Sequence, residues 1–503
     1  MSAEPEWTER ADKRGLDPLG MQNAGVSLYQ NLLPGISNVT LRIRYFAYFC
    51  WVSDAYARNG ASNEFAAWRT WVRRAEALFA LVSSYHGGET GVGGVEWADG
   101  RLALEELEID FAQAASNDPN VTRYLRQSLG VFGGAYYSQM VEVGLFVEGE
   151  HGIQRASNGL GRSAAAAFRE AIGQDVETML VDAIKSAKVS QDVLDELLLI
   201  LPSAIPEGSN ELAIYEQLLL KPAGVEGTVG DLSRSSSLKL VLESARAMEC
   251  RPDPMSVRWH LFSTRTFDHP ALDRQRVRWE AYHCHDIMQI AAAALLEWAI
   301  ELMGEQDAGL MVAEIRRAVW QRLGSHDGAD DPWSEFQGRI DPREHDYREG
   351  WSRLTGRRGI AEQKSWDAVL MLAALFERVA HDSALSETMH LELRGVGNAR
   401  SIVTELKWFA DRAAETVRDL IAAYVVERLV MRHSWVAMQK LRRQKDYTFL
   451  FEVRDGRLLR RNGYAPVATT PRLDPAIQFL VDVGLIDNNG ITERARELLG
   501  EAA

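Results

Sequence analysis

Residues 273–303 read DRQRVRWEAYHCHDIMQIAAAALLEWAIELM, and their apolar side chains recur with the spacing of a helix. This stretch predicts a long amphipathic helix. Its most apolar part, residues 290–302, contains Glu297 and Glu301 and is shorter than the roughly 18 apolar residues of a membrane span. We therefore expect no membrane-spanning segment here and a fold that is mainly α.

The same periodicity predicts helices along most of the chain. They are expected at residues 64–84, 105–117, 121–143, 164–172, 175–188, 191–201, 210–220, 235–248, 308–323, 361–381 and 398–445, with another that opens at Asn38 or Thr40. Two segments predict loops instead. Residues 86–100 are rich in glycine and predict a loop or short ribbon, and the polar, acidic stretch 325–359 predicts a long functional or mobile loop.

The C-terminal segment has a mixed pattern. Residues 447–460 alternate apolar and polar side chains around Asp455-Gly456, which is typical of a β-hairpin. A short helix at 472–483, the run Gly484-Leu485-Ile486 and a final helix follow, so the segment predicts a small winged-helix-like α+β module. Four parts result, namely a polar N-terminal arm (1–24), a helical domain (25–250), a second helical domain (251–445) and the winged-helix-like module (446–503).

Composition and charge narrow the class of protein. The chain has 503 residues, of which 46% are hydrophobic and 25% are charged, the balance of a folded globular protein. Three cysteines and a polar N-terminus without a signal-peptide pattern predict a cytoplasmic protein. The net charge of −15 repels nucleic acid and anionic membranes, so any contact with DNA must come from a local basic surface.

Two regions do concentrate arginine beside aromatic residues, which clamp phosphates and stack on bases. Residues 251–279 hold six arginines against three acidic residues, and residues 432–461 hold nine basic residues against three acidic ones. We predict contacts to double-stranded DNA from both regions. The predicted contact residues are Arg258, Trp259, Arg276, Arg278, Arg442, Arg443, Lys445, Arg457, Arg460 and Arg461.

A third polar cluster lies near the N-terminus. The segment from Asp17 to Asn23 places a carboxylate and side-chain amides beside a tight turn, and a predicted helix follows it closely. Further candidates on that helix are Arg42, Arg44, Tyr45, Trp51 and Asp54, several of them paired at i, i+3 or i, i+4 spacing. The structural alternative is that Arg44 and Asp54 form a buried ion pair that braces the turn.

The sequence contains no good match to a phosphate-binding loop or to a metal-binding motif. Residues 87–94 lack the Gly-Lys-Ser/Thr ending of a phosphate-binding loop. His283 and His285 stand two positions apart, so on a helix they point in different directions, and no second His/Cys cluster offers zinc spacing. We expect neither a metal nor a cofactor.

The run LLPGISNVTLRIRYFAYFCW, residues 32–51, resembles the opening segment of bacterial proteins associated with phage-defence loci. One such family is the anti-phage DNA glycosylase that excises glucosylated hydroxymethylcytosine from phage DNA. Gly15-Leu16-Asp17-Pro18 is also similar to the Gly-Gln-Asp-Pro motif of uracil-DNA glycosylases, with leucine in place of glutamine. The resemblance implies a helical, DNA-binding enzyme of phage defence that leaves abasic sites.

Such an enzyme flips its target base into a pocket and uses a carboxylate to stabilise the sugar cation or to orient water. The candidate carboxylates are Asp17 and Asp54. Gln22 and Asn23 would read base or sugar hydroxyls, and Tyr45 and Trp51 would stack on the base. Arg42 and Arg44 would hold flanking phosphates.

Two other readings stay open. The chain could be a non-enzymatic sensor or scaffold that binds DNA or a partner protein of a defence system. It could also be a ribonuclease, because Arg278 and His283 match the Arg-x4-His spacing of HEPN ribonucleases. Arg428 and His433 match that spacing equally well, so the pattern occurs twice in this arginine-rich chain.

Overall fold

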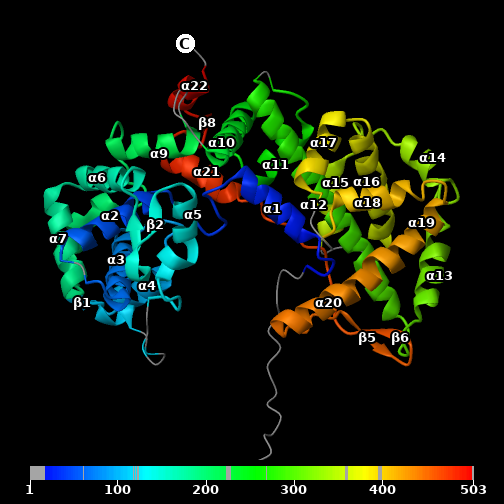
Figure 1. Ribbon diagram of the computed structural model, residues 1–503, viewed down its shortest axis with the longest axis horizontal. Coiled ribbons are helices and arrows are strands. Elements are labelled where there is room, and N and C mark those ends of the chain that lie inside the picture. The colour runs from blue at the N-terminus through cyan, green and yellow to red at the C-terminus, as the bar shows by residue number, and fades with distance from the viewer. Residues whose placement is uncertain are drawn as a thin grey trace, which may run out of the picture. The chain divides into compact units, whose positions relative to one another are not determined.

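The computed structural model describes residues 17–60, 62–116, 118, 121, 124–221, 228–267, 269–356, 361–394 and 399–500 (Figure 1). The chain is mainly helical, as predicted. It divides into two units, each made of two separate pieces of sequence. The first unit comprises the N-terminal residues through Leu28 together with Val277–Thr469, and the second comprises Tyr29–Arg276 together with Thr470–Ala503. Gly15 and Leu16, and with them most of the predicted N-terminal arm, lie outside the described residues.

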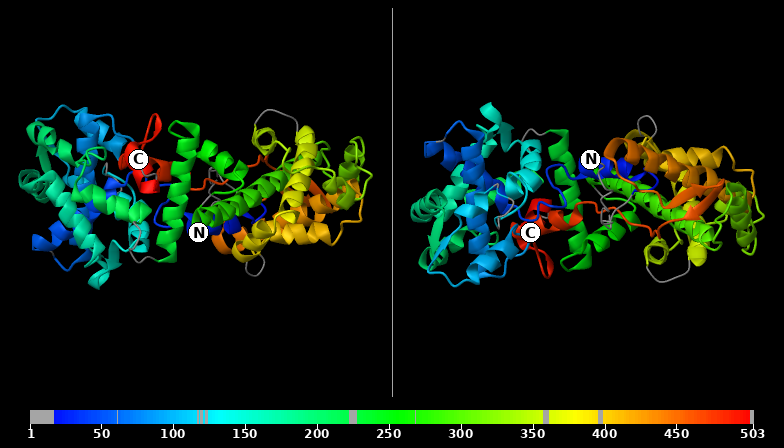
Figure 2. Two further views of the ribbon diagram at one scale, coloured as in Figure 1. Left: turned by 90° about the horizontal axis from the view of Figure 1, so that it is seen from above. Right: turned by 90° about the horizontal axis from the view of Figure 1, so that it is seen from below.

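Helix α12 (Pro270–Met303) supplies the central core of the first unit (Figure 2). Every residue from Ala281 to Ile300 is buried, so this helix is covered on all sides rather than on one face. The amphipathic pattern predicted for it is therefore wrong over this stretch. Its buried carboxylates are compensated by cations, since Glu297 pairs with Lys364 at 3.4 Å and Glu280 pairs with Arg378 at 2.7 Å.

The other elements of the first unit surround this helix or extend from it. They are α13 (Val312–Leu323), α14 (Trp333–Gly338), α15 (Tyr347–Thr355), α16 (Ala361–Ala380), α17 (Ser383–Glu392), α18 (Ile402–Ala410), α19 (Val417–Ala423), the π-helix η5 (Tyr424–Val430), α20 (Met431–Gln444), β5 (Phe451–Arg454) and β6 (Arg457–Arg460). Helix α1 (Gln22–Leu32) begins in the first unit and ends in the second, and α12 likewise spans the boundary at residues 276 and 277.

Three sequence predictions meet different outcomes in the first unit. The hairpin is confirmed, because β5 and β6 pair antiparallel around Asp455 and Gly456, both with positive φ. The long loop 325–359 is wrong, since it contains α14 and α15. The single helix 398–445 is also wrong, because the chain ends α18 at Ala410 and starts α19 after the N-cap Thr416, which pairs with Pro332 in an isolated β-bridge.

In the second unit, α3 (Phe65–His86) is buried along most of its length and packs against α2 (Arg44–Arg58), α4 (Val95–Leu102) and α7 (Gln174–Ser186). Aromatic rings fill the space between these helices. Tyr45, for example, lies 4.7 Å between ring centroids from both Phe79 and Tyr136. This apolar core fixes the positions of the polar side chains discussed below.

The remaining elements of the second unit are short strands and helices. They are β1 (Glu108–Asp110), η1 (Ala112–Ala115), η2 (Phe132–Tyr136), α5 (Tyr137–Glu142), β2 (Phe146–Glu148), η3 (Glu150–Gly152), β3 (Gln154–Ala156), α6 (Leu160–Ile172), β4 (Lys188–Ser190), α8 (Gln191–Glu196), η4 (Leu197–Ile200), α9 (Asn210–Leu220), α10 (Val229–Met248), α11 (Pro254–Ser263), α21 (Leu473–Asp482), β7 (Ile486–Asp487), β8 (Gly490–Ile491) and α22 (Glu493–Leu499). The strands pair as the antiparallel ribbons β1–β4, β2–β3 and β7–β8.

The sequence misjudges several boundaries in this unit. The helix expected at 105–117 is strand β1 followed by a single 3-10 turn, and the helix expected at 121–143 begins only at Phe132. The glycine-rich loop 86–100 contains the start of α4, and the helix expected from Asn38 or Thr40 starts at Arg44.

The predicted module 446–503 does not form one structural unit. Its hairpin belongs to the first unit, whereas α21, β7–β8 and α22 belong to the second. The winged-helix-like arrangement is not confirmed. Within the described residues, no helix is both long enough and apolar enough to span a bilayer.

Candidate functional site

The segment that begins at Asp17 caps helix α1. The Asp17 carboxylate accepts hydrogen bonds from the backbone N–H groups of Gly20 (2.8 Å), Met21 (3.2 Å) and Gln22 (3.0 Å). Gln22 is the first residue of α1, and its N–H group is one that the helix itself cannot satisfy, while Gly20 and Met21 directly precede the helix. Asp17 thus has a structural role in this conformation, and its two oxygens are already engaged.

Four basic side chains hold the backbone carbonyls of the same segment. Three of them lie on α20 and the fourth lies on α12. The pairs are Lys440 with the carbonyl of Asp17 (3.0 Å), His433 with that of Pro18 (3.2 Å), Arg432 with that of Leu19 (2.9 Å) and His285 with that of Met21 (3.0 Å). We call these four side chains the carbonyl clamp. It anchors the start of α1 to the core of the first unit.

The two histidines of the carbonyl clamp are neutral. His433 donates through Nδ1 to Pro18, so its Nε2 accepts the N–H of Leu450 at 3.0 Å. His285 has the opposite tautomer, because its Nδ1 accepts the N–H of Ile402 at 3.2 Å. Burial lowers the pKa of His433 to about 4 and also lowers the pKa of His285.

Asp54, the other predicted catalytic carboxylate, is in the second unit and is partly exposed. It accepts a hydrogen bond from Arg58 at 2.7 Å, an i, i+4 pair on α2. Asp17 belongs to the first unit, so the structure does not bring the two carboxylates together within either unit. Gln22 is half-buried and Asn23 is exposed, both in the first turn of α1.

The predicted base-stacking and phosphate-binding residues of α2 and the preceding turn lie inside the second unit. Tyr45 is 1% exposed and Trp51 is fully buried, so neither offers a ring face to a base. Arg44 is also fully buried and pairs with Glu211 through two contacts of 3.0 and 3.1 Å, not with Asp54.

Arg42 is buried as well. It pairs with Asp482 at 3.0 Å and makes a second, shorter ion pair with Glu89. These findings correct the predicted base-stacking and phosphate-binding roles of four side chains, because each one packs inside the second unit or forms an ion pair there. The four are Arg42, Arg44, Tyr45 and Trp51.

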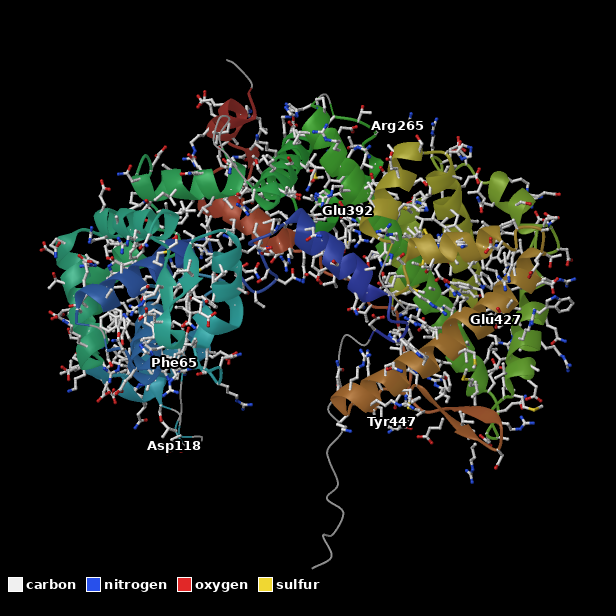
Figure 3. The ribbon with its side chains drawn as sticks, viewed as in Figure 1. Phe65, Asp118, Arg265, Glu392, Glu427 and Tyr447 are labelled. Carbon is white, nitrogen blue, oxygen red and sulfur yellow. The ribbon has the colours of Figure 1, made fainter. Side chains whose placement is uncertain are left out.

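Most of the contact residues predicted in the basic region 251–279 are internal. Arg258, Trp259 and Arg276 are all buried. Arg278 is partly exposed but forms an ion pair, 2.7 Å long, with Glu392. Glu392 is labelled in Figure 3. The prediction that these residues line a DNA-binding surface is therefore wrong for this conformation.

The Arg-x4-His pairs do not form accessible sites either. His283 is fully buried on α12. In the second pair, Arg428 binds the buried carboxylate of Glu405 at 2.5 Å, and His433 is a member of the carbonyl clamp. A ribonuclease needs both side chains at a scissile phosphate, and burial removes the histidine from solvent in each case.

The region 432–461 does present some of its basic residues to solvent. Arg442, Arg443, Lys445 and Arg460 are exposed. Neither Arg442, Arg443 nor Lys445 forms an ion pair with another described residue. Two other predicted DNA-contact residues of this region do have partners within the protein. Arg457 binds Glu314 and the carbonyl of Gly309, and Arg461 lies 3.5 Å from Glu452.

Exposed apolar side chains lie beside these cations. Met431, Trp435 and Met438 are 53%, 41% and 39% exposed, and with Arg442 they follow i, i+4, i+7, i+11 spacing on α20. Tyr447, labelled beside the end of α20 in Figure 3, is 52% exposed. We call this set the α20 surface, and it comprises Met431, Trp435, Met438, Arg442, Arg443, Lys445, Tyr447 and Arg461.

Arginine side chains stack on both exposed rings of the α20 surface. The guanidinium carbon of Arg432 lies 4.3 Å from the ring centroid of Trp435, and that of Arg461 lies 4.1 Å from Tyr447. Sequence reasoning identified the cations but missed Trp435, Met438 and Tyr447. For Trp435 and Met438, the helical spacing with Arg442 was the available signal.

Among the described residues, no group of three or more His, Cys, Asp or Glu side chains is arranged to hold a metal ion. Comparisons with protein-family models, curated proteins and solved structures found no match to this chain.

Proposed function

We propose that this protein binds nucleic acid through the α20 surface, with DNA as the partner. One observation carries the proposal: three exposed cations without ion pairs to described residues lie beside two exposed rings, in a chain whose net charge is −15. A surface of this kind overcomes the repulsion of the whole molecule only locally. It therefore defines where the nucleic acid is bound.

The two kinds of side chain have separate tasks. Arg442, Arg443 and Lys445 bind phosphates, and this sequence-independent contact supplies most of the affinity. Trp435 and Tyr447 stack on unpaired bases, which are available in single strands, at distorted sites or where a base is flipped out. We therefore expect tighter binding to single-stranded or mismatched DNA than to a plain duplex.

The first test measures the binding of labelled single-stranded and duplex DNA by fluorescence anisotropy over a range of salt concentrations. Substituting Arg442→Gln together with Arg443→Gln should weaken binding about tenfold or more and should lower the log–log salt slope by about 2. The matched control is Arg316→Gln with Arg317→Gln, an adjacent exposed pair on α13 without ion pairs to described residues. Equal losses in both double variants would overturn the assignment to the α20 surface.

Stacking is tested separately. Trp435→Ala and Tyr447→Ala should each weaken single-strand binding by about 1–3 kcal/mol and should leave the salt slope unchanged. Phe65→Ala, which removes another exposed ring, 37% exposed at the start of α3, is the control. If the control weakens binding as much, the rings of the α20 surface have no specific role.

Base excision from modified phage DNA is the activity that the sequence resemblance implies, and binding at the α20 surface is compatible with it. Its carboxylate is unassigned, because Asp17 is a helix cap and Asp54 is a surface ion-pair partner. The assay incubates the protein with DNA that carries plain, hydroxymethylated or glucosylated cytosine and then treats it with alkali. Breaks in one modified DNA alone would support a glycosylase, and binding without breaks would favour a sensor or scaffold.

A further inference from the structure

A pocket of about 560 Å³ opens in the second unit, far in sequence from the α20 surface. It lies where the C-terminal ends of α2 and α7 meet the first turns of α3, whose first residue, Phe65, is labelled in Figure 3. Its volume is in the range of pockets that bind small organic ligands, about 300–1,000 Å³. The small side chains of Ala66 and Ala67 keep it open on the α3 side.

Two cations line the pocket, Arg74 and Lys185. Nη1 of Arg74 donates to the carbonyls of Ile184 (3.4 Å) and Lys185 (3.0 Å) and so fixes the guanidinium against the end of α7. Its Nε is buried and has no hydrogen-bond partner among the described atoms. The Lys185 ammonium donates one hydrogen bond, to Asn59 Oδ1 at 2.7 Å, which leaves further donors.

These cations lack a carboxylate partner in the described structure, since neither forms an ion pair with a described residue. Burial lowers the pKa of Arg74, and the charge of Asp110, which acts in the opposite direction, offsets only part of this effect. The one carboxylate in the lining belongs to Glu64, which is exposed. The interior of the pocket is therefore short of negative charge.

Aromatic rings form the opposite part of the lining. Tyr56 and Trp71 lie with their ring centroids 5.8 Å apart. Their polar atoms are already used, because the Tyr56 hydroxyl donates to the carbonyl of Ser62 (2.8 Å) and Trp71 Nε1 donates to that of Val52 (3.0 Å). Both residues thus contribute apolar ring surface to the pocket rather than hydrogen bonds.

We propose that this pocket binds a small phosphate ester that carries a flat ring, of the size of a mononucleotide. The phosphate takes the open donors of Arg74 and Lys185, and the ring lies against Tyr56 and Trp71. The volume limits the size of the ligand, the two cations favour a negative charge on it, and the aromatic wall favours a flat ring. The inference is independent of DNA binding, because none of its residues belongs to the α20 surface.

The test uses the full chain and isothermal titration calorimetry with AMP, GMP, CMP and UMP as probes. Inorganic phosphate and the four uncharged nucleosides are the comparison ligands. We expect at least one mononucleotide to bind with a Kd below about 1 mM, and we expect phosphate and the matching nucleoside to bind at least about tenfold more weakly.

Three variants assign the site. Lys185→Gln should weaken mononucleotide binding about fivefold or more, and Ala67→Leu should weaken it by filling the pocket. Glu64→Gln should strengthen it about two- to fivefold, because a repelling charge is removed at the rim. Arg162→Gln, an exposed cation of α6, is the control and should change nothing.

Several results would overturn the proposal. They are the failure of all four mononucleotides to bind, equal binding of phosphate or of the nucleoside, and unchanged affinity in Lys185→Gln and Ala67→Leu with a normal melting temperature. The opposite sign for Glu64→Gln would also count against it. DNA binding by the α20 surface is measured separately, so each proposal can fail alone.

Discussion

Arg42 and Arg44 in the second unit differ sharply from Arg442 and Arg443 in the first, although both pairs stand in basic, aromatic sequence. Arg44 is fully buried and finds its carboxylate in Glu211, 167 residues away. Arg442 and Arg443 are exposed and have no ion pair with a described residue. Similar sequence surroundings thus produce a structural brace in one unit and an exposed basic surface in the other.

The largest effect should come from breaking the brace. Arg44→Ala leaves Glu211 as an uncompensated buried carboxylate, which should lower the free energy of unfolding by about 3–5 kcal/mol. Urea titration followed by far-UV circular dichroism measures this loss. Arg442→Ala should change the same quantity by less than about 0.5 kcal/mol.

The double variant Arg44→Met with Glu211→Leu tells an ion pair from a packing site. Because both charges leave together, it should be much more stable than Arg44→Ala alone. If it is no more stable, the arginine acts through its shape and its bond to the carbonyl of Leu201 (2.6 Å), and the comparison must be revised.

The two units should also respond to pH in opposite directions. In the second unit, Glu76 is fully buried and accepts the N–H groups of Val131 and Phe132 at 3.1 and 2.5 Å. Burial raises its pKa to about 8. A raised pKa in the folded state means that the stabilisation is present at low pH and is lost as pH rises towards 8 and beyond.

The expected loss is on the order of 4 kcal/mol from pH 4.5 to above pH 8. Hydrogen exchange at the amides of Val131 and Phe132 should report it as a falling protection factor. Glu76→Gln mimics the protonated acid, so its protection should lose this pH dependence. A wild-type profile as flat as that of the variant would contradict the assignment.

The histidines of the carbonyl clamp should destabilise the first unit in acid. The pKa of His433 is lowered to about 4, so its contribution is complete above the ordinary value near 6.5 and is lost as pH falls towards 4. The expected change is about 3 kcal/mol for His433. Exchange at the Leu450 amide, which donates to this histidine, measures it.

His433→Gln serves as the comparison, since it keeps a donor and an acceptor but does not titrate in this range. Its Leu450 amide should be less protected at neutral pH, and that protection should change less between pH 6.5 and pH 4. Equal slopes in both proteins would show that another group controls the acid response.

The smallest expected effects on the free energy of unfolding distinguish Asp17 from Asp54, the two predicted catalytic carboxylates. Asp17→Ala removes the cap of α1 and should cost about 1–2 kcal/mol of unfolding free energy. Asp54→Ala removes a partly exposed i, i+4 pair and should cost less than about 0.5 kcal/mol. Thermal melts of both variants check the order. A catalytic role would appear instead as lost base excision at unchanged stability.

The sequence predicts those elements whose signals are local. Helix α9 has the expected bounds, Asn210–Leu220, and the Asp455-Gly456 hairpin forms where its turn residues indicate. The helix expected at 121–143 fails because Glu76, more than fifty residues earlier, binds the N–H groups of Val131 and Phe132 at the point where the helical turns begin.

The residues of the candidate site also fall into those that the sequence could predict and those that it could not. The exposed cations at the end of α20 follow from composition and helix position, and the structure leaves them on the surface. The roles given to Arg42, Arg44, Tyr45 and Trp51 could not be judged from sequence, because their partners and neighbours come from distant segments. Asp482, for example, lies 440 residues from Arg42. The pocket has the same origin, since it combines the ends of three helices.

The interleaving of the two units also has a consequence for biosynthesis. Phe46, near the start of the second unit, packs its ring against Phe479 of α21, with 5.6 Å between centroids. A ribosome makes the chain from the N-terminus, so this aromatic core cannot close until the chain has been synthesised through α21. Premature termination anywhere before α21 would therefore release a chain with an exposed apolar core, a natural substrate for chaperones and proteases.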